Sequence, residues 1–223
     1  MIRKPDFDTA AIKASEILLQ NHITETPIHP IRFLRDWDGV RVVPFTRMAM
    51  DAGIERNDLV PMFGANQDAA TFHLNMPGME DVKYVVFYNM RLPYEIIDRG
   101  IAREFGHIVL GHDGSTRTPE ARLMEAMCFA HHLLSPRPII HLMQQSGMPV
   151  TMSMLAQTTG CSEECVEDMQ MIPGAHVPKE LNIRIRDAFA PHINEYLRFH
   201  VASPMLDKSP VLDFGTFMDF YEE

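Results

Sequence analysis

The sequence predicts an α+β protein in which a pair of helices packs on a small, mostly antiparallel sheet and an all-helical module follows. Three observations predict this class. Short runs of β-branched and aromatic residues occur before residue 90, helical spacing of apolar residues begins after Pro93, and short segments separated by glycine and proline fill the remainder. With 46% hydrophobic and 22% charged residues, the chain of 223 residues can bury a full core.

Apolar residues at helical spacing predict a first helix over residues 8–21, followed by a short second helix over 31–36. Three runs rich in β-branched and aromatic residues predict strands over residues 40–43, 70–74 and 84–88. Pro44 has no backbone N–H to donate, so it should confine the first strand to an edge of the sheet.

Two longer helices are expected next. Residues 94–110 have apolar side chains three or four apart, and Gly111 can end this helix. After a polar loop, residues 120–134 form the second helix, whose buried stripe should hold Leu123, Ala126, Ala130 and Leu133. Pro136 and Pro138 close it, which predicts one domain over residues 1–138 and a second over 139–223.

The second domain should consist of short helices over residues 139–146, 152–158 and 162–171, and a longer one over 179–200. Gly160 in the turn and Ser162 as N-cap give the last two short helices a helix-turn-helix pattern. Pro191 predicts a kink or a break in the long helix. We expect the acidic, aromatic tail over residues 203–223 to dock on another surface.

Composition points to the cytoplasm. The chain has no apolar run of the roughly 18 residues that span a bilayer and no secretory signal, and its three cysteines do not suggest a disulfide framework. A formal net charge of −10 argues against a nucleic-acid partner. The helix-turn-helix pattern has no Lys or Arg between Arg137 and Lys179, and four acidic residues crowd its second helix. We therefore expect this module to pack or dock on protein, with DNA binding as the weaker alternative.

The segment that carries chemistry is R-E-F-G-H at residues 103–107. In the pattern H-E-x-x-H, two imidazoles four residues apart lie on one helix face and hold one Zn²⁺, while the Glu acts as general base on a zinc-bound water. Glu104 and His107 are in register with this pattern, but Arg103 stands where the first histidine would be. The segment thus has a metallopeptidase-like arrangement that lacks one ligand.

A second segment, residues 125–136, has the form E-A-x-x-F-A-x-x-L-L-x-P. Together the two segments resemble the ImmA/IrrE family of zinc metallo-endopeptidases over residues 8–138, and more loosely to about residue 172. The resemblance implies a zincin-like helix pair, with Glu104 as general base and His107 and Glu125 as zinc ligands. It also implies cytosolic regulatory proteolysis of a repressor-like protein.

Arginine cannot take the place of the missing ligand, because its guanidinium has no lone pair to donate and stays protonated. Only two of the three protein ligands of a catalytic zinc site remain. We predict that Arg103 pairs with Glu125 or Glu104 and replaces the metal as a clamp. The expected protein is metal-poor, catalytically impaired and able to bind a protein partner. An active zinc endopeptidase with a rearranged ligand set and a DNA-binding regulator are the alternatives.

Other candidate residues have simpler interpretations. On an unbroken helix His112 would point away from the face of His107, unless Gly111 redirects it. We expect His131 and His132 to form a solvated pair on the surface. The three cysteines, Cys128, Cys161 and Cys165, are expected to pack as small hydrophobic residues.

Overall fold

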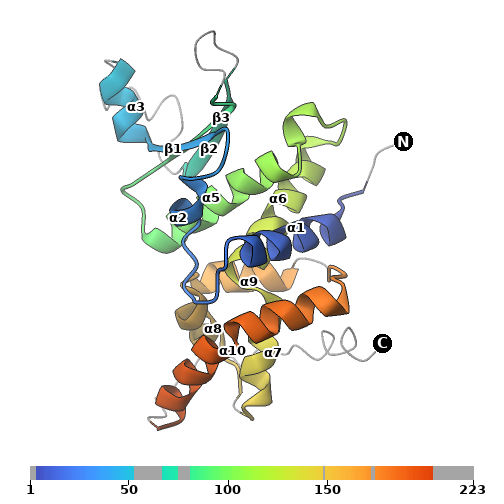
Figure 1. Cartoon of the computed structure of the whole chain (residues 1–223). Helices are drawn as coiled ribbons and strands as arrows, with labels where there is room; N and C mark the ends of the chain where they lie inside the picture. Colours follow the sequence, from blue (N-terminus) through green and yellow to red (C-terminus); the bar gives the residue numbers. More distant parts are fainter. Residues whose placement is uncertain (1–3, 53–66, 75–80, 148, 172–173, 203–223) are drawn as a thin grey trace.

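The computed structural model describes residues 4–52, 67–74, 81–147, 149–171 and 174–202. It is a mixed α+β structure, as predicted, in which helices predominate and a small sheet lies at one end of the molecule (Figure 1). The predicted tail over residues 203–223 lies outside the described residues. Within the part that is described, no helix has the length and apolar composition needed to cross a bilayer.

The sheet has the strand order β1-β3-β2, formed by β1 (Val40–Pro44), β2 (Ala69–His73) and β3 (Tyr84–Tyr88). All three strands were predicted within a residue or so, and β1 lies at an edge as Pro44 requires. β2 pairs antiparallel with β3, but β1 runs parallel to β3. The expectation of a mostly antiparallel sheet is therefore wrong. The stretch between β1 and β3 contains the unpredicted helix α3 (Phe45–Ala52) and β2, so it is long enough for the crossover that a parallel pair needs.

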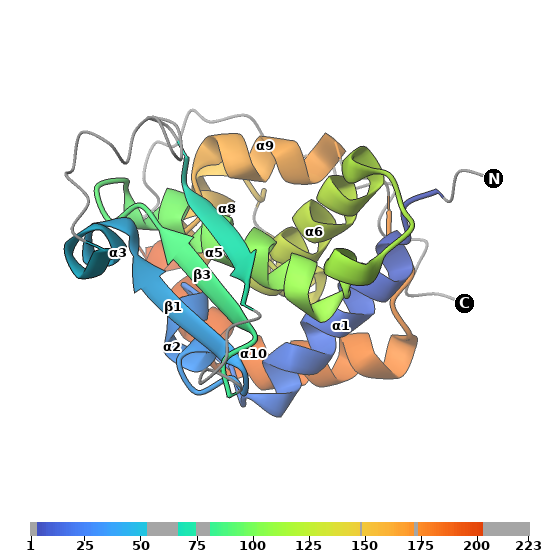
Figure 2. The same cartoon turned by 90° about the horizontal axis from the view of Figure 1, so that it is seen from above.

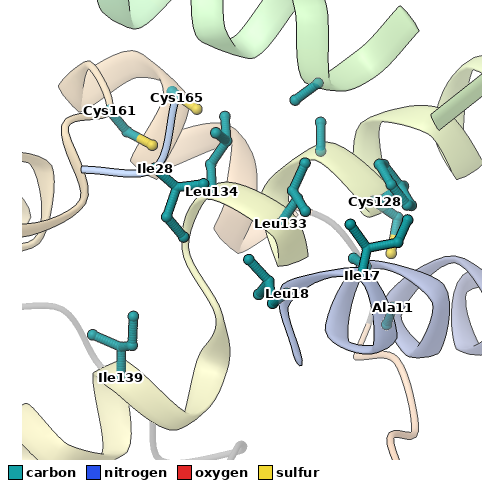
Figure 3. Packing of buried hydrophobic residues seen from close by; sticks show 14 of the residues in the cluster. Ala11, Ile17, Leu18, Ile28, Cys128, Leu133, Leu134, Ile139, Cys161 and Cys165 are labelled. Atoms are coloured by element: carbon teal, nitrogen blue, oxygen red, sulfur yellow. The ribbon is translucent and has the colours of Figure 1, made fainter. Parts of the chain in front are cut away.

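The other helices before residue 135 follow the prediction closely. They are α1 (Phe7–Gln20), α2 (Pro30–Leu34), α5 (Tyr94–Val109) and α6 (Pro119–Leu134), with the short 3-10 helix η1 (His112–Gly114) between the last two. α5 lies along the sheet, and α6 packs against both α5 and α1 (Figure 2). Cys128 of α6 is buried against α1, as predicted (Figure 3). Leu123 is instead 44% exposed, so it lies outside the buried stripe of α6.

A close approach between α5 and α6 depends on Gly106. A Cβ atom added there would lie 3.0 Å from Cδ1 of Phe129 and 3.1 Å from the carbonyl oxygen of Ala126. Next to this contact the Phe105 ring packs edge-on against Trp37 and Phe129, with centroid distances of 4.8 and 5.6 Å. The glycine thus lets the two helices that carry the candidate site approach closely.

The C-terminal part consists of α7 (Arg137–Gln145), α8 (Met152–Thr159), α9 (Glu163–Met171) and α10 (Lys179–Ala202). Gly160 ends α8 at φ +70°, and Oγ of Ser162 accepts a hydrogen bond from the Cys165 N–H at 3.1 Å, as its predicted capping role requires. α10 continues through Pro191, so a break at this proline is excluded, and the alternative of a kink stays a prediction. Buried residues on both sides of the proline, Phe189 and Ile193, hold this helix in the core.

One hydrophobic cluster includes residues from both predicted domains. Leu18 and Phe129 from the first part belong to the same cluster as Ile139 and Phe189 from the second. The domain boundary at residue 138 stays a prediction. α5 and α6, the two helices that carry the candidate site residues, lie between the sheet and the C-terminal helices (Figure 1).

Candidate functional site

Arg103 of α5 binds two carboxylates. Its Nη1 and Nη2 donate to the two oxygens of Asp68 at 3.1 and 2.9 Å, a bidentate pair. Its Nη2 and Nε also donate to Oε1 of Glu104 at 2.9 and 3.3 Å. Burial disfavours the charged form of Arg103, but the Asp68 and Glu104 carboxylates outweigh it and raise the pKa of this side chain. The guanidinium is thus firmly held as a cation between two acids.

Gly100 provides the space for the Asp68 carboxyl group. A Cβ atom at Gly100, one turn before Arg103 on α5, would lie 2.9 Å from Cγ of Asp68. Asp68 directly precedes β2, and its own Oδ1 also accepts the Ala69 N–H at 2.7 Å. The ion pair therefore ties the start of an edge strand to the middle of α5.

The predicted pairing of Arg103 is confirmed for Glu104, and the structure adds Asp68. Glu125 takes no part, because it belongs to a separate cluster. Glu104 is 9% exposed and has its Oε1 occupied by the guanidinium. Among the described hydrogen bonds and ion pairs, none joins Glu104 to His107 or Glu125.

Glu125 of α6 is completely buried and has three partners from three different segments. Its Oε2 lies 3.0 Å from Nε2 of His112, and its Oε1 accepts the backbone N–H of Asp6 at 2.5 Å and a hydrogen bond from Nη1 of Arg117. Nη2 of Arg117 also lies 3.7 Å from Oδ2 of Asp6, the N-cap of α1. The guanidinium that neutralises Glu125 is therefore that of Arg117, not that of Arg103.

His112 connects the two predicted metal ligands. Its Nδ1 lies 2.8 Å from Nδ1 of His107, while its Nε2 faces Glu125. The expectation that His112 would point away from His107 is wrong, because Gly111 adopts φ +64° and turns the chain back toward α6. The result is a linear chain of hydrogen bonds from Glu125 through His112 to His107.

The linear chain places His112 between the two side chains that the sequence predicts as zinc ligands, with one ring nitrogen facing His107 and the other facing Glu125. Within the described ranges, no group of three His, Cys, Asp or Glu side chains is arranged to hold a metal ion. A carboxylate that hydrogen-bonds one imidazole nitrogen fixes the tautomer and the orientation of that ring, and Glu125 stands in this relation to His112.

The electrostatics of the cluster keep both histidines neutral. Burial, together with the nearby His112 and Arg103, lowers the pKa of His107 to about 4. Burial also lowers the pKa of His112, although Glu125 acts in the opposite direction. A proton on Nε2 of His112 can therefore be donated to Glu125, and its Nδ1 can accept from Nδ1–H of His107. In that arrangement the Nε2 lone pair of His107 remains available.

Sequence reasoning missed several residues of these clusters. Asp6, Asp68 and Arg117 carry no local motif. Asp6 and Asp68 come from segments that precede α5 in the chain, and Arg117 comes from the loop between α5 and α6. His131 and His132 were wrongly expected at the surface. They are 5% and 6% exposed because α6 lies in the interior with neighbouring helices on more than one side, and burial lowers the pKa of His132 to about 3.

Comparisons of the chain with protein-family models, with curated proteins and with solved structures find no match. The resemblance to the ImmA/IrrE family therefore rests on the residues quoted from the sequence. The roles assigned to Glu104, His107 and Glu125 stay predictions.

Proposed function

We propose that this chain is a metallopeptidase-like protein of the ImmA/IrrE type that binds a protein partner without zinc-dependent cleavage. The observation that carries the proposal is the double engagement of Arg103. Its guanidinium lies where the sequence pattern expects a ligand, pairs with Asp68 and holds Glu104. A cation fixed at this point repels a second cation, and it competes for the carboxylate that would accept a proton from water.

The second predicted ligand is engaged in a similar way. Glu125 already has a guanidinium, an imidazole and a backbone N–H as partners. A metal ion would have to displace Arg117 or His112 before it could bind this carboxylate. Losing those partners leaves buried polar groups without hydrogen bonds, which typically costs about 1–3 kcal/mol each. Both observations support a scaffold stabilised by its own arginines.

The partner class comes from the resemblance. Family members of this kind act on repressor-like regulatory proteins, so we propose a protein of that class as the binding partner. A protein that cannot complete the cleavage would act by sequestering its partner. The acidic chain, with a formal charge of −10, favours a partner surface of opposite charge.

Zinc titration of the purified, metal-stripped protein tests the metal part of this proposal. We expect no stoichiometric zinc binding by the natural protein at micromolar zinc. Arg103→His should raise the zinc affinity at least tenfold, and combining it with Arg117→Gln should raise it further because Glu125 is released. Arg99→His is the matched control, since Arg99 lies one turn earlier on α5 and pairs with Asp168 of α9. It should leave zinc binding unchanged.

Zinc bound by the natural protein would contradict the metal part of the proposal. Stoichiometric zinc in the natural protein that is lost in both Glu125→Ala and His112→Ala would establish a rearranged ligand set and favour an active endopeptidase. A separate filter-binding measurement with duplex DNA at low salt tests the DNA-binding alternative. The acidic α9 should give no retention above that of a non-binding acidic protein.

A further inference from the structure

The turn η1 carries His112 back toward α6, but it is too short to fix that ring by itself. It has three residues and follows Gly111, which adopts φ +64°. A glycine permits this conformation among many others, and a single 3-10 turn has poor hydrogen-bond geometry. A Cβ atom at Gly111 would meet nothing within 4 Å, so close packing does not confine the turn there. Contacts from other elements must therefore fix the position of His112.

One such contact comes from the sheet. The hydroxyl group of Tyr84, the first residue of β3, donates a hydrogen bond to Oδ2 of Asp113 at 2.8 Å. Asp113 directly follows His112 in η1. The Tyr84 ring is itself stacked on His73 of β2, with a centroid distance of 5.1 Å, so the phenol is oriented by its neighbour. This contact ties η1 to two strands.

A second contact comes from α6. Nη1 of Arg122 donates to the backbone carbonyl oxygen of His112 at 3.0 Å. Arg103 and Arg117, the other two arginines of the site, bind carboxylates. Among the described contacts of the Arg122 side chain, none is with a carboxylate, and its Nε is buried without a hydrogen-bond partner. Its guanidinium is therefore engaged with η1 and not with an ion pair.

The two contacts act on adjacent residues of η1, one on the backbone of His112 and the other on the side chain of Asp113. The His112 ring has a partner on each nitrogen, at 2.8 Å from Nδ1 of His107 and at 3.0 Å from Oε2 of Glu125. Hydrogen bonds weaken steeply outside a narrow range of distance and angle. A small displacement of η1 would therefore break at least one of the two.

We propose that Tyr84 and Arg122 are positioning residues that hold η1 in place and thereby keep the hydrogen-bond chain from Glu125 through His112 to His107 intact. The histidine geometry then depends on how the sheet and α6 pack around the turn. This inference does not depend on the proposed protein partner or on zinc, because it concerns the arrangement of the side chains alone.

The hydrogen-bond chain imposes a particular tautomer on His107, which makes the proposal measurable. Glu125 accepts the proton on Nε2 of His112, so Nδ1 of His112 is an acceptor and His107 carries its proton on Nδ1. A neutral imidazole in water prefers its proton on Nε2, and the hydrogen bonds of the ring decide which form a protein holds. His107 should therefore return to the Nε2–H form when His112 moves away.

Two-bond ¹H–¹⁵N correlation spectra of the imidazole rings at neutral pH test the proposal. In the natural protein we expect the Nδ1–H form of His107. Tyr84→Phe and Arg122→Met should each move its tautomer equilibrium toward the Nε2–H form by about twofold to tenfold, and the double variant should move it further. Arg122→Met should have the larger effect, because its hydrogen bond is partly buried and that of Tyr84 is exposed.

Matched variants separate positioning from a general loss of stability. Arg99→Met removes a partly buried arginine that pairs with Asp168, so it should destabilise the protein and leave the His107 tautomer unchanged. Tyr88→Phe, at the other end of β3, should also leave it unchanged. Asp113→Asn keeps an acceptor for the phenol and should preserve the Nδ1–H form better than Asp113→Ala does.

Three results would overturn the proposal. They are an Nε2–H form of His107 in the natural protein, an unchanged Nδ1–H form in the double variant, and an effect of Arg99→Met as large as that of Arg122→Met. Tyr84→Phe loses a hydrogen bond at the surface, so it should keep the fold and provides the test if Arg122→Met does not fold. An unchanged tautomer in Tyr84→Phe would then count against the proposal.

Discussion

The carboxylate of Asp68 accepts two parallel hydrogen bonds from Arg103, at 2.9 and 3.1 Å, and so fixes the side chain that distinguishes this site from H-E-x-x-H. Asp68 precedes β2 and Arg103 lies in the middle of α5, so a contact between distant segments sets the charge of the site. The arginine is thus part of the packing between sheet and helix.

Asp68→Asn should destabilise the protein by about 1–3 kcal/mol, because it leaves a mostly buried guanidinium with Glu104 as its remaining anion. Urea denaturation at neutral pH measures this. The control is Asp187→Asn, which removes the partner of Arg186 in a pair with exposed fractions of 36% and 61%. The control should change the free energy of unfolding by less than about 0.5 kcal/mol. Equal effects of the two variants would contradict the structural role of the Asp68 pair.

Gly106→Ala should destabilise the protein by about 1–2 kcal/mol. The new methyl group would meet the Ala126 carbonyl of α6, a backbone atom that cannot rotate away, and this cost exceeds the gain of about 1 kcal/mol in helix propensity. Gly114→Ala is the matched control, since a Cβ atom there meets nothing within 4 Å. Thermal unfolding of both variants measures the difference in stability. A Gly106→Ala protein as stable as the control would mean that α5 and α6 lie farther apart.

Arg117 and Glu125 should be energetically coupled. A double-mutant cycle with Arg117→Met and Glu125→Gln should give a coupling energy of about 1–3 kcal/mol, since Glu125 is fully buried and Arg117 is 22% exposed. The same cycle on Lys13 and Glu16, an exposed pair on α1, should give about 0–1 kcal/mol. Coupling energies of equal size would show that Arg117 does not neutralise the buried carboxylate.

His132 should contribute to acid destabilisation. Its folded-state pKa of about 3 lies below the ordinary value of 6.5, so between those pH values the unfolded chain binds a proton that the folded chain does not. The free energy of unfolding is therefore highest above pH 6.5 and falls as pH decreases toward 3. From pH 7 to pH 5 this one group should cost about 2 kcal/mol.

Urea denaturation at pH 7, 6 and 5 tests that prediction. His132→Gln should show a shallower decrease of stability with falling pH than the natural protein, although it starts from a lower stability. His73→Gln, at an exposed position on β2, should keep the natural slope. Parallel curves for His132→Gln and the natural protein would contradict the assignment of this histidine as buried and neutral.

Much of the fold could be predicted from the sequence because local patterns report local structure. The strand at Tyr84–Tyr88 and the helix beginning at Tyr94 were predicted within a residue, and the end of α5 followed from Gly111. α3 was missed, and the direction of β1 was wrong. Strand direction depends on how the intervening chain returns to the sheet, which residue pattern alone does not encode.

By itself the sequence determined that Arg103, Glu104 and His107 lie on one short stretch of helix, and their spacing predicts a metallopeptidase-like site with an arginine at the position of one histidine. It also determined that Arg103 needs an anion nearby, because a guanidinium stays charged at physiological pH. Only the tertiary structure decided which anions those are. Asp68 reaches Arg103 from a segment 35 residues earlier in the chain. Arg117 folds back on Glu125 from the loop before α6, and Gly111 turns His112 back to join His107 with Glu125. Ion pairing acts through space over a few ångströms, so the partner of each charge depends on packing between segments and not on their order along the chain.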